Sequence, residues 1–413
     1  MNSLSRFDAP VSRVTQSPRI YYVHPLQLNG LDAWRETFRH ASSLGFNTVL
    51  TAPIFKRGKQ TSVFVSSDFD RVDPALGLGE DVAAVSRALS DAAAEHNISL
   101  MLDLVIDRVA ASDREGAHIT SDPRIAPDES CSLALDLSPS DQTYRHLEEW
   151  RARLARLIKN GVAGFRCLGI NRVPAEVWKS LIGHSRAERS GPQFIAWTPG
   201  TDFGSRRALQ GAGFDGSFSS LAWWNLEDSW LPEEHLIQRS LGYQVAFPEA
   251  PFGKRLAHGT ESCEVLERRA LRALKLSAYL VGGLMIPMGF EFGASMPLDQ
   301  MSGDGLGLAG LRDQSAFDIS SEIRATNEQL HQSDEDFDRR PFTLIAGSNS
   351  STVAILQSDR EDLRVSQKVR AILVNRDLRQ SAATPLNAIQ QVASAFLPLT
   401  ANDGASAPRL KPG

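Results

Sequence analysis

Cysteine is scarce in this chain of 413 residues. The three cysteines are Cys131, Cys167 and Cys263, and no C-x-x-C spacing occurs. An odd, sparse set excludes a disulfide framework and a cysteine zinc site, and it is typical of a reducing compartment. The sequence therefore predicts a cytoplasmic protein without a bound metal.

Long apolar runs and clusters of one charge are also missing. No stretch of 18 apolar residues occurs, and the first 13 residues lack the apolar core of a signal peptide. The formal net charge is −5, without a basic patch or basic helix face, which argues against nucleic-acid binding. No G-x-G-x-x-G follows a predicted strand and no Walker motif occurs, so we expect no nucleotide cofactor. We expect neither a membrane span nor a nucleic-acid partner.

What the chain does contain is a regular alternation of apolar strands and amphipathic helices. The run at 98–106 is apolar on both faces, as in a buried parallel strand. Helical spacing follows at 141–159 and 175–186, with strands at 162–167 and 193–198 around the second helix. Further strand signals lie at these positions: 19–25, 47–54, 213–218, 242–247 and 283–288.

This alternation predicts an α/β fold, a (β/α)8 TIM barrel followed by a small C-terminal antiparallel β domain. The β domain is indicated by the runs FTLIAG, STVAIL and RAILVN. The predicted boundaries are an N-terminal extension at 1–18, the barrel at 19–335, the β domain at 336–400 and a disordered tail at 401–413.

Four segments resemble the signature motifs of the α-amylase superfamily (glycoside hydrolase family 13). They are SSDFDRVDPALGLGEDVAAV after the second strand, LMLDLVIDR at the third, GVAGFRCL at the fourth and GGLMIPMGFEFG at the eighth. IYYVHPL and FPEAPFGKRL are similar to the degenerate amylase-like barrel of bacterial maltosyltransferases that use maltose-1-phosphate. The resemblance covers about residues 19 to 400.

The resemblance implies a retaining glycosidase site, yet the expected acids are missing. Leu168 stands where the fourth-strand motif has its nucleophilic aspartate, and Trp197 stands where the fifth strand has its acid glutamate. Glu249 is the only carboxylate in FPEAP, where the family has a third acid. Cys167 is a poor substitute, because strand alternation directs it to the other face. Trp197 either fills the old pocket or stacks on a sugar.

Other family positions keep part of their chemistry. Asp103 and Arg166 are retained, and a buried arginine must be paired, so we expect them to form a structural ion pair. The family's Asn-His pair appears as Asp107-Arg108, and its stacking tyrosine as Phe64. His24, at the end of the first strand, faces the cleft or is a satisfied structural histidine.

Trp223 and Trp224 follow the sixth strand, in LAWWNLEDSW together with Trp230. They are sugar platforms if exposed, or the buried start of a helix. The loop at 109–140 is shorter than the family's calcium-binding subdomain, and its acids lack a calcium-loop spacing. We expect no metal there. These acids are Asp113, Glu115, Asp122, Asp128 and Glu129.

The sequence therefore predicts a catalytically degenerate barrel of α-glucan metabolism. Its expected partners are an α-glucan or maltooligosaccharide, or an active maltosyltransferase domain or subunit that it serves as a structural or regulatory module. The alternative is an active hydrolase or maltosyltransferase with relocated carboxylates drawn from Asp107, Glu249 and Glu291. A third interpretation is a nonfunctional remnant or a fragment of a longer chain.

Overall fold

The computed structural model describes most of the chain. The described residues are 18–59, 61–111, 132–188, 191–331, 342–346, 351–358, 369–383 and 409–410. The statements below refer to these ranges.

Eight parallel strands close into a barrel, in the order β1-β12-β11-β10-β9-β8-β5-β2. This confirms the predicted TIM barrel. The strands are β1 (Arg19–Val23), β2 (Thr48–Thr51), β5 (Ser99–Leu104), β8 (Gly164–Cys167), β9 (Gln193–Ala196), β10 (Gly216–Phe218), β11 (Tyr243–Ala246) and β12 (Gly282–Pro287).

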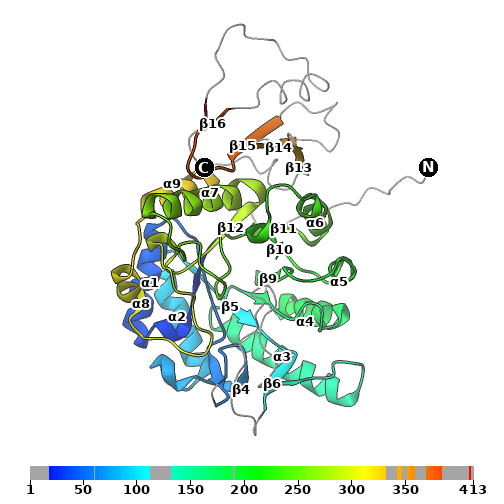
Figure 1. The fold of residues 1–413 in the computed structure, drawn as a ribbon. Coiled ribbons are helices and arrows are strands. Elements are labelled where there is room, and N and C mark those ends of the chain that lie inside the picture. The colour runs from blue at the N-terminus through cyan, green and yellow to red at the C-terminus, as the bar shows by residue number, and fades with distance from the viewer. Residues whose placement is uncertain are drawn as a thin grey trace, which may run out of the picture.

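Helices form a ring around the barrel (Figure 1). They are α1 (Gly30–Ser43), α2 (Val82–Ala94), α3 (Asp141–Lys159), α4 (Ala175–Glu188), α5 (Phe203–Ala208), α6 (Trp230–Gln238), α7 (Cys263–Val281), α8 (Gly307–Asp313) and α9 (Ser320–His331). Short 3-10 helices are η1 (Pro25–Gln27), η2 (Pro74–Leu76), η3 (Leu221–Trp223), η4 (Arg239–Leu241) and η5 (Phe290–Phe292).

Helix α3 illustrates why these segments fold as they do. Its buried residues include Leu147, Trp150 and Leu154, spaced three or four apart on one face. Ser140 caps the helix, since its side-chain oxygen accepts a hydrogen bond from the backbone N–H of Thr143 at 3.1 Å. The amphipathic pattern and the cap therefore specify both the buried face and the start of this helix.

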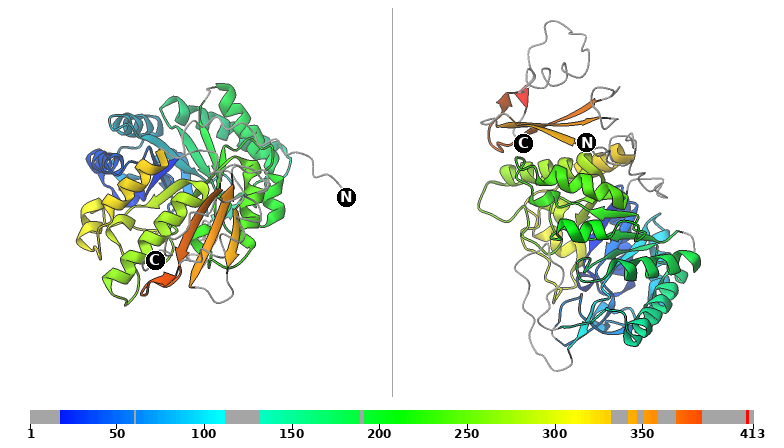
Figure 2. Two further views of the ribbon diagram at one scale, coloured as in Figure 1. Left: turned by 90° about the horizontal axis from the view of Figure 1, so that it is seen from above. Right: turned by 90° about the vertical axis from the view of Figure 1, so that its right-hand side faces the viewer.

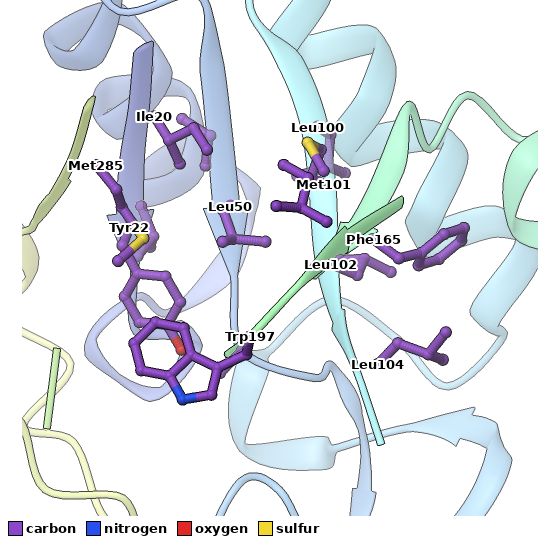
Figure 3. Close-up of a cluster of buried hydrophobic side chains, with 14 of the residues drawn as sticks. Ile20, Tyr22, Leu50, Leu100, Met101, Leu102, Leu104, Phe165, Trp197 and Met285 are labelled. Carbon is purple, nitrogen blue, oxygen red and sulfur yellow. The ribbon is translucent and has the colours of Figure 1, made fainter. Parts of the chain in front are cut away.

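Alternation along the barrel strands separates two layers of side chains. Asp103 lies opposite Arg166 in the register of β5 and β8. Figure 3 shows Tyr22, Trp197 and Met285 on one side of β5, whereas Phe165 and Leu104 point to the other side. The first group belongs to the barrel interior, where the resemblance places the site.

Two hairpins leave the barrel at the ends of strands. β3 (Phe55–Arg57) pairs with β4 (Ser66–Val72), and β6 (Arg108–Ala110) pairs with β7 (Ser132–Ala134), both antiparallel. The five acids of the loop between β6 and β7 lie outside the described residues, so their predicted role stays a prediction.

A small antiparallel sheet stands outside the helix ring, beside α7 (Figure 2). It has the order β13-β14-β15, with β13 (Phe342–Ala346), β14 (Thr352–Ser358) and β15 (Val369–Asn375). This confirms the predicted C-terminal β domain. Gln357 of β14 donates a hydrogen bond to the carbonyl oxygen of Leu280 at 2.9 Å, and Arg370 of β15 donates to that of Tyr279 at 2.8 Å. The sheet is thereby tied to the end of α7.

The ends of the chain are described only in part. β16 (Ala382–Ala383) pairs with β17 (Arg409–Leu410). The predicted extension and the predicted disordered tail lie almost entirely outside the described residues, and the exact domain boundaries stay predictions. In the described ranges, every helix is too short or too polar to cross a membrane.

Candidate functional site

The centre of the barrel mouth holds a buried ion pair. The guanidinium of Arg166 donates two hydrogen bonds to the Asp103 carboxylate, at 2.5 and 2.6 Å. The hydroxyl of Tyr22 donates a third at 2.9 Å. Burial raises the pKa of the Asp103 carboxyl, and the positive charge of Arg166 opposes that rise. Both carboxylate oxygens are therefore engaged by fixed donors.

Aromatic rings surround this ion pair. The Arg166 guanidinium carbon lies 4.6 Å from the ring centre of Tyr22, 4.7 Å from that of Trp197 and 5.6 Å from that of Phe218. Phe247 completes the group by stacking on Trp197, with ring centres 5.2 Å apart and planes 16° apart. We call Tyr22, Trp197, Phe218 and Phe247 the aromatic cluster. Three of its rings make cation–π contacts with Arg166, in addition to the ion pair with Asp103.

Trp197 follows β9 and is 6% exposed. Phe247 stacks on it, and Phe218 lies 5.2 Å away between ring centres. The guanidinium carbon of Arg166 lies 4.7 Å from its ring centre. A sugar needs an open ring face for stacking, whereas these contacts cover the indole. The geometry thus favours filling of the pocket.

Leu168 directly follows β8 and is fully buried. Its backbone N–H donates to the carbonyl oxygen of Leu104 at 3.0 Å, which continues the barrel pairing. Cys167 is also fully buried, and desolvation raises the pKa of its thiol well above the ordinary value. A buried thiol with a raised pKa is a poor nucleophile.

Asp107 ends the segment after β5 and is 2% exposed. Arg172, from the loop after β8, donates to its carboxylate at 2.5 Å, and Arg108 does so at 3.2 Å. Gly169 has a φ of +72°, and a Cβ there would lie 3.1 Å from the Asp107 carboxylate. Glycine thus lets the β8 loop approach a carboxylate that two arginines neutralise.

Glu249 lies in the loop after β11 and is 4% exposed. Arg255 donates to one carboxylate oxygen at 2.5 Å, and the backbone N–H of Leu256 donates to the other at 2.7 Å. Burial raises the pKa of Glu249, and Arg255 opposes that rise. Arg255 also donates to the carbonyl oxygen of Met288 at 2.6 Å. The ion pair of Glu249 and Arg255 thus connects the loop after β11 to the end of β12.

Glu291 belongs to η5 and lies against α1. Its carboxylate accepts hydrogen bonds from Tyr21 at 2.6 Å and from the ring of His40 at 2.9 Å. Tyr21 precedes Tyr22 on β1, so alternation directs it away from the aromatic cluster. Glu291 therefore supports the barrel wall and is not brought together with Asp103.

His24 and Phe64 are both buried, at 0% and 3% exposure. Phe252 lies between them, with ring centres 5.4 Å from His24 and 5.3 Å from Phe64. The ring nitrogens of His24 contact backbone groups at Asp299 and Leu26. The structure brings these predicted sugar-binding residues together, but as a packed group.

The tryptophans after β10 pack inward as well. Trp224 is 8% exposed, donates from its indole to the carbonyl oxygen of Asp228 at 2.9 Å, and packs near Phe342 of β13. Trp223 is half-buried, with its ring edge-on to Phe247 at 5.5 Å. Trp224 thus connects the loop after β10 to the C-terminal sheet, and its burial leaves little open ring surface.

Sequence reasoning missed three side chains that contact the predicted acids: Arg172, Arg255 and His40. Arg255 follows Glu249 by only six residues, and that proximity was the available signal, whereas Arg172 lies 65 residues from Asp107. His40 lies 251 residues from Glu291, so its pairing required the closed barrel. Within the described ranges, no three His, Cys, Asp or Glu side chains gather in a way that could hold a metal ion.

Comparison with known proteins identifies a maltosyltransferase as a sequence relative. The chain is 30% identical over 407 residues to the alpha-1,4-glucan:maltose-1-phosphate maltosyltransferase of Burkholderia pseudomallei (strain K96243). The match covers 93% of this chain but 35% of the relative, so the chain spans about a third of that protein. No protein-family model matches the chain.

Solved structures share the fold at lower identity. An α-amylase from Lactobacillus plantarum superposes with a TM-score of 0.63 and 18% identity, covering 89% of this chain and 90% of that one. A noncanonic maltogenic α-amylase from Thermotoga neapolitana gives 0.65 and 16%, covering 89% and 87%. The cyclic α-maltosyl-(1→6)-maltose hydrolase of Arthrobacter globiformis gives 0.61 and 14%, covering 91% and 94%.

The closed parallel barrel with its C-terminal sheet is the fold of the α-amylases. The chain thus shares the fold of the α-amylases, and it is similar in sequence to about a third of a maltosyltransferase.

Proposed function

We propose that this barrel is catalytically inactive and serves as a structural module for a maltosyltransferase in α-glucan metabolism. The observation that carries the proposal is the aromatic cluster, which fills the mouth around Arg166 and Asp103. A retaining glycosidase must admit a sugar at this place, between its two carboxyl groups.

The missing acids support the same conclusion. Leu168 and Trp197 occupy the positions that the family resemblance assigns to nucleophile and acid, and both are buried. Asp103, Asp107 and Glu249 are each bound to an arginine. Both carboxylate oxygens of Asp103 and of Glu249 accept hydrogen bonds from within the protein, so neither side chain is free to protonate a leaving group. The alternative of relocated carboxylates would require breaking these ion pairs.

The proposed partner follows from the sequence relative. That protein is a maltosyltransferase almost three times as long as the matched segment. The segment that resembles this barrel is therefore only one part of the relative. Glucan binding at the mouth is less well supported, because Phe64, Trp197 and Trp224 are buried. We keep the cytoplasm as the predicted compartment.

The purified protein is expected to show no turnover. Maltooligosaccharides would be incubated with and without maltose-1-phosphate, and products followed by chromatography against a no-enzyme blank. We expect no hydrolysis, phosphorolysis or maltosyl transfer above background. Turnover that disappears in Asp107→Asn or Glu249→Gln would establish the relocated-carboxylate alternative and end the proposal.

Calorimetry and sedimentation separate the two binding roles. Titration with maltose, longer maltodextrins and maltose-1-phosphate is expected to give no heat of binding. Co-sedimentation with a purified maltosyltransferase is expected to give a complex. Glucan binding without a complex would replace the structural role by a carbohydrate-binding one.

Restoring the family's acids is expected to fail. The double change Leu168→Asp with Trp197→Glu should give no activity, because effects of residues that act as a unit are not additive. It should also lower the free energy of unfolding by several kcal/mol, about 2–7 for each buried polar group. Leu168→Asn with Trp197→Gln is the matched control for lost packing without charge. A stable, active double mutant would mean that the sugar pocket is still open.

A further inference from the structure

A segment at the barrel mouth, Asp299–Gly303, is fastened to the end of β1. A Cβ at Gly303 would lie 2.0 Å from the carbonyl oxygen of Leu26, so the two backbones are in direct contact. We call Asp299–Gly303 the mouth segment. Its position next to η1 requires glycine at 303.

His24 connects η1 to the mouth segment through both ring nitrogens. Nε2 lies 2.6 Å from the carbonyl oxygen of Asp299, and Nδ1 lies 3.4 Å from the backbone nitrogen of Leu26. A carbonyl oxygen can only accept and a backbone N–H can only donate. The two contacts therefore specify a neutral ring with its proton on Nε2.

Protonation would break this arrangement. A second proton on Nδ1 would face the N–H of Leu26, so a donor would meet a donor. The ring is fully buried, with Phe252 edge-on at 5.4 Å, which leaves the new charge without water. Burial disfavours the charged ring more than the Asp299 carboxylate and the backbone hydrogen bonds at Asp299 and Ser302 favour it.

We propose that the His24 ring is an acid-operated clip, whose protonation releases the mouth segment from the barrel. The closed form holds the neutral ring between Leu26 and Asp299. The open form lets the charged ring reach water and frees the backbone that it held.

The charged groups around His24 set the balance. Burial lowers its pKa to about 4, the Asp299 carboxylate raises it, and the positive charge of Arg57 lowers it. Arg57 is itself paired with Asp73 at 2.8 Å and donates to the carbonyl oxygen of Met301 at 2.7 Å. Arg57 thus contacts the mouth segment and opposes protonation at the same time.

The sign of the pH effect follows from the lowered pKa. A ring with a pKa of about 4 in the closed form and about 6.5 in the open form binds a proton preferentially when open. The closed form is fully stable above pH 6.5 and loses stability as the pH falls toward 4. Between pH 7 and pH 4.5 the opening equilibrium should rise roughly 50-fold.

Hydrogen exchange read by mass spectrometry, corrected for intrinsic rates, tests the clip. Peptides covering 24–28 and 298–304 are expected to lose protection between pH 7 and pH 4.5, while peptides of α3 keep theirs. His24→Gln retains one donor and one acceptor but cannot be protonated, so its exchange should not respond to pH. His146→Gln is the matched control, since its ring binds the carbonyl oxygen of Ile106 at 2.9 Å, and its pH response should equal that of the wild type.

Two further variants keep the test decisive if His24→Gln does not fold. Asp299→Asn removes the negative charge beside the ring, so the midpoint of opening should move to lower pH. Gly303→Ala should release the same peptides already at pH 7 and so define the exchange of the open form. Loss of protection that is equal in all peptides, or a midpoint that Asp299→Asn does not move, would overturn the proposal.

Discussion

Trp197→Ala is expected to lower the free energy of unfolding by about 3–5 kcal/mol. The indole is 6% exposed and is packed against Phe247, Phe218 and the guanidinium of Arg166. Its removal would leave a cavity whose walls belong to several different strands and cannot easily collapse. Urea unfolding followed by circular dichroism would measure the loss.

The control for this change is Tyr144→Ala on α3, whose side chain is 61% exposed and should alter stability by less than about 0.5 kcal/mol. A stability loss in Trp197→Ala as small as that of Tyr144→Ala, together with weaker glucan binding, would identify Trp197 as a sugar platform. The pocket-filling interpretation would then be wrong.

Asp103→Ala is expected to cost about 3–5 kcal/mol, because it strands Arg166 as a buried charge. The Arg166 side chain is 3% exposed, and the Asp103 carboxylate is its bidentate partner. Removing both charges, as Asp103→Ala with Arg166→Met, should cost less than the sum of the two single changes. A double-mutant cycle by denaturant unfolding measures this coupling.

The surface pair of Arg71 and Glu80 provides the comparison. Its side chains are 45% and 62% exposed, so Glu80→Ala should cost no more than about 1 kcal/mol. If the Asp103 cycle gives a coupling as small as that of the surface pair, the aromatic rings alone would account for the stability of Arg166.

Much of the fold could be predicted from local patterns. The segment of β5 is apolar on both faces, which predicts a buried strand. The segment of α3 has a helical period of apolar residues, which predicts a helix with one buried face. The antiparallel sheet β13-β14-β15 likewise matches three short apolar runs. These signals are local because backbone period and burial are local properties of sequence.

The candidate site was less predictable, because the role of each residue depends on side chains that come into contact only after folding. A sequence shows Trp197 in a strand-end position, but not that Phe247, 50 residues later, stacks on it. It shows Glu249, but not that the chain turns so that Arg255 returns to bind it. Whether Trp224 is exposed depends on Phe342, which belongs to the C-terminal sheet.

The attachment of that sheet to α7 has a consequence for how the molecule unfolds. Gln357 and Arg370 occupy the last carbonyl groups of the helix, which otherwise lack partners. Gly282 follows at once and begins β12, the strand that pairs with both β1 and β11. Detaching the sheet uncaps the helix that leads into the strand closing the barrel. We therefore expect the sheet and the barrel to unfold together, with β14 and β15 restraining the opening of β12 and of its neighbour β1.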